Sequence, residues 1–139
     1  MRKTISIVIA LIMVTCTATV CFGESSIVNP GTGVGLYYVN AESVSNSLRI
    51  NNGKAVCSTT VTGKKGTTKI EITMTLQKKI KNSWVTAVKP WKGSKKGVSY
   101  TLTQKASVGR GVYRLKSVAV VYKGGKPETV TKYSGTVKY

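Results

Sequence analysis

The feature that most constrains the fold is a strict alternation of apolar and polar side chains within Thr68–Lys79. The apolar positions are Ile70, Ile72, Met74 and Leu76, and the polar positions between them are Glu71, Thr73, Thr75 and Gln77. A period of two residues places successive side chains on opposite faces of a β-strand. The segment is therefore predicted to be a strand with one face in a core and the other in water.

Further strand-like segments follow one another along the chain. The expected strands are Ser47–Ile50, Lys54–Thr62, Trp84–Trp91 (with Pro90 at an edge or bulge), Val98–Thr103, Val112–Tyr122, Thr129–Ser134 and Thr136–Tyr139. In Val98–Thr103, we expect Val98, Tyr100 and Leu102 to face the core.

Turn-forming residues separate these segments. Tight turns are expected at Asn52-Gly53 and Lys123-Gly124-Gly125-Lys126, another turn at Gly63–Gly66, and a basic loop at Gly93–Gly97. About seven strands at spacings of about 8–15 residues, with no helical period, predict an all-β fold. A single antiparallel β-sandwich is favoured, with a small barrel as the alternative.

The N-terminal segment has the three parts of a secretory signal peptide. Arg2 and Lys3 form a positive start, an uncharged apolar stretch follows, and Cys21-Phe22-Gly23 supplies small residues for cleavage before Glu24. An uncleaved anchor is the alternative, because the uncharged stretch could nearly span a bilayer about 30 Å thick. Lipidation at Cys16 or Cys21 is less favoured, since neither cysteine follows a small residue.

We expect three parts in the chain. Residues 1–23 form the signal peptide, residues 24–35 a flexible leader that contains proline and glycine, and residues 36–139 one β-sandwich domain. A domain of this length can bury about two thirds of its unfolded surface. Cys57 is the one cysteine outside the signal segment, so the core has to hold the domain without an internal disulfide, unless Cys57 pairs between chains.

Basic residues greatly exceed acidic ones. The chain has 22 Lys and Arg, 4 Asp and Glu and no His, a formal charge of +18, and loss of Arg2 and Lys3 with the signal peptide lowers it to +16. A field of this sign attracts polyanions such as teichoic acids, anionic lipid head groups or extracellular DNA, without reading a sequence. The competing interpretation is that lysines keep the surface soluble and protect edge strands. The lysines in expected turns and strands are Lys64, Lys65, Lys69, Lys78, Lys79, Lys95, Lys96, Lys116, Lys123, Lys126 and Lys132.

The residues needed for common enzyme chemistry are missing. Without His or Asp, the chain cannot form a Ser-His-Asp or Cys-His site or a His-based metal site. The carboxylates are Glu24, Glu42, Glu71 and Glu128, and their spacing does not favour a glycosidase pair. Cys57 shares the parity of Ala55 and Val61, which indicates a small buried side chain rather than a reactive thiol. We therefore predict no enzymatic activity and no catalytic, cofactor-binding or metal-binding residues.

Aromatic side chains are the other candidates for a binding role. They are Trp84, Trp91, Tyr37, Tyr38, Tyr100, Tyr113, Tyr122, Tyr133 and Tyr139. Exposed rings could stack on sugars or bases, but core packing is the favoured role. Trp84 and Trp91 are an odd number of residues apart, so one is expected in the core and the other on the surface, unless a bulge at Pro90 brings them together.

The segment Gly111-Val112-Tyr113-Arg114-Leu115 resembles the start of strand F in immunoglobulin-like and fibronectin type III-like sandwiches. The resemblance implies that the Tyr113 hydroxyl bonds to the backbone upstream, and that Leu115 and Cys57 occupy core positions. Leu115 stands where antibody domains have their second cysteine.

The chain is also similar in style to small basic secreted proteins of Gram-positive bacteria that have no assigned function. This similarity rests on the signal peptide, the KIEITMTLQKK strand, the Trp84–Trp91 pair, Gly111–Arg114 and the KPETVTKYS end. It implies a secreted sandwich protein and supplies no catalytic residue.

Together these patterns predict a secreted, non-enzymatic protein. Its expected partner is an anionic cell-wall polymer or membrane surface, bound through distributed lysine charge, without specific recognition of nucleic acid and without a metal or cofactor. The alternative is a secreted cationic effector, such as a toxin, bacteriocin-like protein or inhibitor, that acts on other cells.

Overall fold

The computed structural model describes residues 37–139, which form nine β-strands and no helix. The strands are β1 (Ala41–Asn51), β2 (Lys54–Gly63), β3 (Thr67–Ile80), β4 (Ser83–Thr86), β5 (Trp91–Lys96), β6 (Ser99–Ser107), β7 (Val112–Lys123), β8 (Lys126–Tyr133) and β9 (Val137–Lys138). The predicted signal peptide and leader lie outside the described residues.

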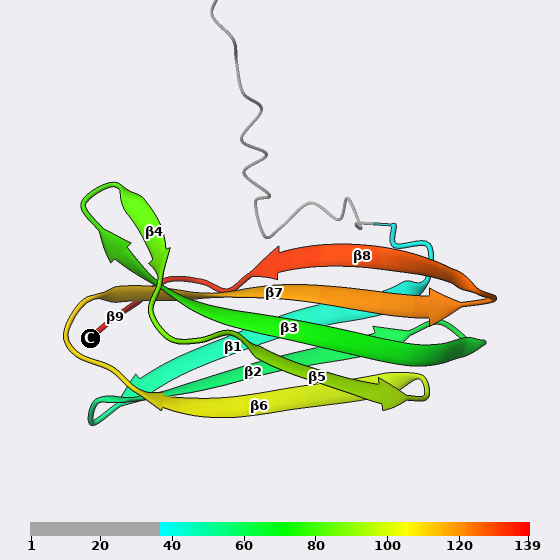
Figure 1. Ribbon diagram of the computed structural model, residues 1–139, viewed down its shortest axis with the longest axis horizontal. Coiled ribbons are helices and arrows are strands. Elements are labelled where there is room, and N and C mark those ends of the chain that lie inside the picture. Colours follow the sequence, from blue (N-terminus) through cyan, green and yellow to red (C-terminus); the bar gives the residue numbers. More distant parts are fainter. Residues whose placement is uncertain (1–36) are drawn as a thin grey trace, which may run out of the picture. The chain divides into compact units, whose positions relative to one another are not determined.

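The strands form two antiparallel sheets that pack face to face (Figure 1). The smaller sheet has the order β1-β2-β6, and the larger has the order β4-β3-β7-β8, with β5 also paired to β3 and β9 to β7. The predicted all-β antiparallel sandwich is confirmed. Its arrangement is consistent with an immunoglobulin-like architecture, although the strands between β3 and β6 stay on the β3 edge and leave three strands in the smaller sheet.

Several predicted bounds are wrong. The predicted strand Trp84–Trp91 is divided into β4 and β5, because residues 87–90 interrupt its pairing with β3, where the Ala87 N–H still bonds to the Leu76 carbonyl oxygen. Both strands pair with the same edge of β3, so the interruption contains Pro90 at an irregular edge position, as predicted. The predicted basic loop Gly93–Gly97 is mostly β5, which pairs with β3 through Lys96. The division of Trp84–Trp91 adds a strand, and the chain has nine strands where about seven were expected; β9 falls within the predicted strand Thr136–Tyr139.

The core lies between the sheets and follows the predicted alternation. The four apolar side chains of β3 (Ile70, Ile72, Met74 and Leu76) are at most 1% exposed. They pack with Cys57 and Val61 of β2 and with Leu115 and Val121 of β7. Val98 is an exception to the prediction: it is 49% exposed, because it lies in the connection before β6, whereas Leu102 is buried and Tyr100 half-buried.

Tyr113 forms the corner that its resemblance to strand F implies. Its ring is 2% exposed, and its hydroxyl donates a hydrogen bond to the Gly109 carbonyl oxygen at 2.8 Å. Leu115 and Cys57 are both fully buried, as the same resemblance implies. The bond fixes the connection from β6 to β7, where the chain crosses from the smaller sheet to the larger.

The Glu128 carboxylate holds the start of β1 against the edge of the larger sheet by hydrogen bonds. Glu128 of β8 accepts hydrogen bonds from the backbone N–H groups of Val39 and Asn40, both at 2.6 Å, and of Ala41 at 2.8 Å. The Asn40 side chain donates to the carbonyl oxygens of Val121 and Lys126. The start of the smaller sheet is therefore held against the hairpin between β7 and β8.

A second polar link crosses the interior of the sandwich. The hydroxyls of Thr59 on β2 and Ser117 on β7 lie 2.6 Å apart, and both residues are fully buried. Thr59 donates its proton to the side-chain oxygen of Asn46 at 3.0 Å, so Ser117 is the donor to Thr59. The polar atoms inside this core thus have partners, which keeps their burial from costing stability.

Replacing Tyr113 by Phe tests the corner. The variant Tyr113→Phe keeps the buried ring but removes the bond to Gly109, and we expect it to lower the free energy of unfolding by about 1 kcal/mol. Urea unfolding followed by tryptophan fluorescence measures the change. An unfolding curve identical to that of the original chain would contradict a stabilising corner.

Glu128 should make stability depend on acid pH. Partial burial works to raise its pKa, but the backbone donors at Ala41, Val39 and Asn40 and the charge of Lys64 outweigh burial, so its pKa lies below the ordinary 4.5. The stability that the ionised Glu128 carboxylate contributes is therefore fully present above its ordinary pKa. That stability is lost as the pH falls through the lowered pKa of the folded protein. We expect Glu128→Gln to cost about 1–2 kcal/mol at pH 7 and to make the loss of stability below about pH 5 shallower.

The matched control is Glu42→Gln. Glu42 is exposed and forms no hydrogen bond or ion pair within residues 37–139. Urea unfolding of both variants at neutral and acid pH compares the two carboxylates. The proposed role of Glu128 fails if the two variants show the same stability at every pH.

Candidate functional site

The outward side of the larger sheet carries a group of basic residues that we call the cationic face. Residues directly opposite each other on paired antiparallel strands share a face. This rule places six basic side chains on the outward side of β3, β5 and β7: Lys69, Lys79, Lys92, Lys96, Arg114 and Lys116. Lys69 lies directly opposite Lys96 in the pairing of β3 with β5, so like charges adjoin.

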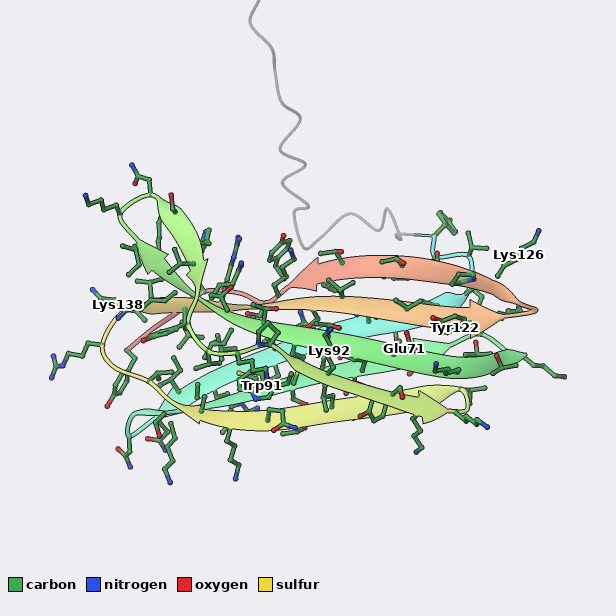
Figure 2. The ribbon with its side chains drawn as sticks, viewed as in Figure 1. Glu71, Trp91, Lys92, Tyr122, Lys126 and Lys138 are labelled. Carbon is green, nitrogen blue, oxygen red and sulfur yellow. The ribbon has the colours of Figure 1, made fainter. Side chains whose placement is uncertain are left out.

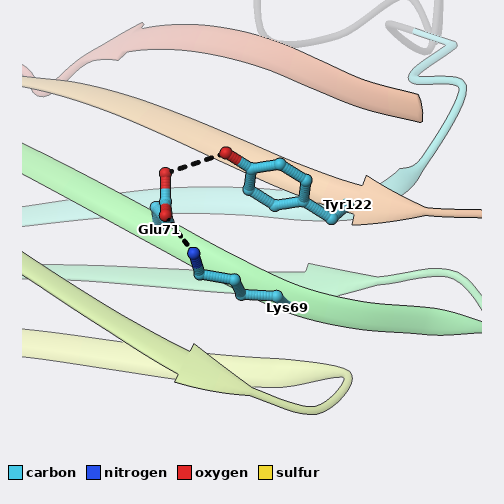
Figure 3. Close-up of polar contacts among 3 residues, drawn as sticks. All are labelled: Lys69, Glu71 and Tyr122. Carbon is cyan, nitrogen blue, oxygen red and sulfur yellow. Dashed lines mark hydrogen bonds and ion pairs between the residues drawn. The ribbon is translucent and has the colours of Figure 1, made fainter. Parts of the chain in front are cut away.

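Glu71 is the carboxylate of this face (Figure 2). It forms an ion pair with Lys69 and accepts a hydrogen bond from the Tyr122 hydroxyl at 3.1 Å (Figure 3). The bond from Lys69, with that from Tyr122, lowers the pKa of Glu71, and the bond to Glu71 raises the pKa of Lys69 and of Tyr122. Glu71 is thus an ionised partner of Lys69 rather than half of an acid–base pair.

Arg114 stands at the other end of the face, among aromatic rings. Its guanidinium carbon lies 4.3 Å from the centroid of the Trp84 ring and 4.4 Å from that of Tyr133. Its Nε donates a hydrogen bond to the Gln77 side-chain oxygen at 2.8 Å. We call these four residues (Gln77, Trp84, Arg114 and Tyr133) the Arg114 cluster; each comes from a different strand.

The two tryptophans have different surroundings, as their odd spacing predicts. Trp91 is half-buried and packs against the core beside Met74 (Figure 2). Trp84 lies opposite Lys79 on the outward side and contacts Arg114, with the Lys79 ammonium 5.9 Å from its ring. Trp84 is therefore the tryptophan of the outward side, and Trp91 the one beside the core.

A shallow depression of about 430 Å³ lies between β3 and β5 on the same face. Its lining residues are Glu71, Ile72, Thr73, Lys92, Gly93 and Ser94. The chain has no histidine, and Glu71 is already bonded to Lys69 and Tyr122. The lining therefore supplies polar and cationic contacts for a ligand but no evident pair for acid–base catalysis.

The outward side of the smaller sheet has a different chemistry. The pairing of β1, β2 and β6 places hydroxyl side chains on it: Ser43, Ser45, Ser47, Ser58, Thr60, Thr62, Ser99, Thr101, Thr103 and Ser107. Arg49, Lys54 and Lys105 share this side at one end of the sheet. Neighbouring hydroxyls bond across the strands, Ser58 to Thr103 and Thr60 to Thr101, both at 2.9 Å. The alternating hydroxyls are visible in the sequence, but their union in one sheet depends on strand register.

Other candidates from the sequence do not form a site. Cys57 is fully buried, and burial raises the pKa of its thiol to about 11. Within residues 37–139 no three His, Cys, Asp or Glu side chains cluster as metal ligands, and no helix there is long and apolar enough to span a membrane.

No protein-family model matches this chain, and the comparison with curated proteins gives no match either.

The buried thiol gives a direct test of the core around Cys57. Because the thiolate is the reactive form, and burial both hides the sulfur and raises its pKa, the folded protein should react with a chromogenic disulfide reagent far more slowly than the protein in urea. Absorbance at pH 8 measures both rates. Equal rates would contradict the buried position.

Proposed function

We propose that the protein is secreted, is not an enzyme and associates with anionic polymers of the cell envelope through its cationic face and its other lysines. The observation that carries the proposal is the unbalanced charge of the domain. All Lys and Arg except Arg2 and Lys3 lie in residues 37–139, where Lys69–Glu71 is the one ion pair between side chains. Most of the positive charge therefore remains available to an external anion.

The amino-terminal sequence supports export. A chain released by signal cleavage would meet teichoic acids and anionic lipid head groups, and the resemblance to small basic secreted proteins of Gram-positive bacteria supports this setting.

The state of the acidic and thiol groups supports a binding role over catalysis. Glu71 and Glu128 are engaged by Lys69 and by backbone N–H groups, and Cys57 is a buried neutral thiol.

One observation favours the second candidate, a cationic effector that acts on other cells. The hairpin of β3 and β4 extends beyond the rest of the two sheets (Figure 1). It carries Ile80 and Val85, which are 46% and 41% exposed, beside Lys79 and Lys81. Apolar side chains next to cations suit contact with an anionic membrane. Inhibited growth of neighbouring strains, or dye leakage from anionic vesicles, would favour this candidate.

Salt dependence tests the envelope proposal. Distributed surface charge is screened as ionic strength rises, so co-sedimentation with purified cell walls should fall at least about tenfold in affinity between about 0.05 M and 0.5 M salt. Walls from which anionic polymers have been extracted serve as the control and should bind weakly. Binding that ignores salt, or no binding at low ionic strength, would refute the proposal.

A further inference from the structure

We infer that the Arg114 cluster is an oxyanion site that takes one phosphodiester group of an extended anionic polymer. The inference rests on the proposed function and deepens it, because it assigns a ligand chemistry to one place on the cationic face.

The first argument is that Arg114 is already positioned. The rings of Trp84 and Tyr133 lie against its guanidinium, and Gln77 accepts the bond from its Nε. These contacts restrict a side chain that would otherwise lose much freedom on binding. The two terminal nitrogens, Nη1 and Nη2, form no hydrogen bond within residues 37–139. They remain as a planar fork of donors, which matches two oxygens of one anion.

The second argument is the charge around the fork. Lys116 lies two residues along β7 from Arg114, on the same side of the sheet and about 6.7 Å away along the strand. The Lys79 ammonium lies 5.9 Å from the centroid of the Trp84 ring. No carboxylate pairs with these three cations in the described part of the chain, and Glu71 is held by Lys69. An anion at the fork would relieve their mutual repulsion.

The third argument concerns the shape of the anion. A planar carboxylate presents both of its oxygens to the fork. A tetrahedral phosphodiester presents its two charged non-bridging oxygens in the same way, and its two ester oxygens continue into the neighbouring units of a chain. We assign the phosphodiester because the anions of the proposed setting, teichoic acids and lipid head groups, carry phosphate. The surrounding sheet continues with Lys92 and Lys96 on β5, which suits a polymer with successive charges more than a single small ion. The distribution of charge therefore favours a chain laid along the strands.

The decisive variant is Arg114→Lys, which keeps the charge but removes the planar fork. Its control is Arg49→Lys, since Arg49 is exposed on the outward side of the smaller sheet. The probe is soluble poly(glycerol phosphate), titrated by calorimetry at about 0.15 M salt. We expect Arg114→Lys to weaken binding about five- to tenfold and Arg49→Lys to leave it within about twofold. Equal affinities of the two variants would overturn the site.

Two further ligands decide the chemistry and the source. A polyuronate of similar length carries carboxylates, and vesicles with phosphatidylglycerol carry phosphodiesters on a membrane. We expect the difference between Arg114→Lys and Arg49→Lys to be largest with poly(glycerol phosphate). If the two variants differ in affinity for the polyuronate as much as for poly(glycerol phosphate), the preference for phosphodiesters is refuted. If they differ more in affinity for the vesicles, the polymer is refuted as the source of the phosphodiester.

The fold and the proposed function are checked separately. Tyr133→Leu removes one ring without changing charge, and it should weaken poly(glycerol phosphate) binding about two- to threefold while urea unfolding confirms that the variant folds.

If the original chain does not bind walls but still binds the polymer through Arg114, the envelope proposal fails and the site stands. If it binds walls and Arg114→Lys binds equally well, the site fails and the envelope proposal stands.

Discussion

The pairing of β3 with β7 is the constraint on which the rest of the structure depends. Its register sets Leu76 opposite Leu115, both fully buried, and sets Gln77 opposite Arg114 on the outward side. A shift by one residue would turn the apolar side chains of one strand to water. The same pairing therefore creates the core and assembles the cationic face, so the two cannot vary independently.

Hydrophobic burial drives the sheets together, but polar contacts fix how they meet. Thr59 and Ser117 bond across the interior, and Glu128 binds the backbone that leads into β1. Such directional contacts favour one alignment of two sheets that would otherwise have many similar ways to pack. Cys57 is free and buried, so these contacts hold the two sheets of residues 37–139 together without a disulfide there.

Local signals made much of the fold predictable. The alternation in Thr68–Lys79 predicted β3, and Asn52-Gly53 predicted the turn in which both residues have positive φ angles, 47° and 72°. The Arg114 cluster and the role of Glu128 were not predicted. Arg114 and Gln77 are 37 residues apart, and Glu128 lies 87 residues from Ala41, so these contacts exist only once strand register is known. The division of Trp84–Trp91 was not predicted either, because the two extra residues between β4 and β5 are apparent only from the pairing of both strands with β3.

The hydroxyl side chains on the smaller sheet give the domain two unlike sides. A polymer held by the cationic face would leave Thr60, Thr101 and their neighbours pointing outward. A surface coated in this way would exchange its negative charge for a layer of hydroxyls with a few cations at one end of each sheet. The coating would then change what the next molecule encounters, from an anionic surface to one rich in hydroxyls.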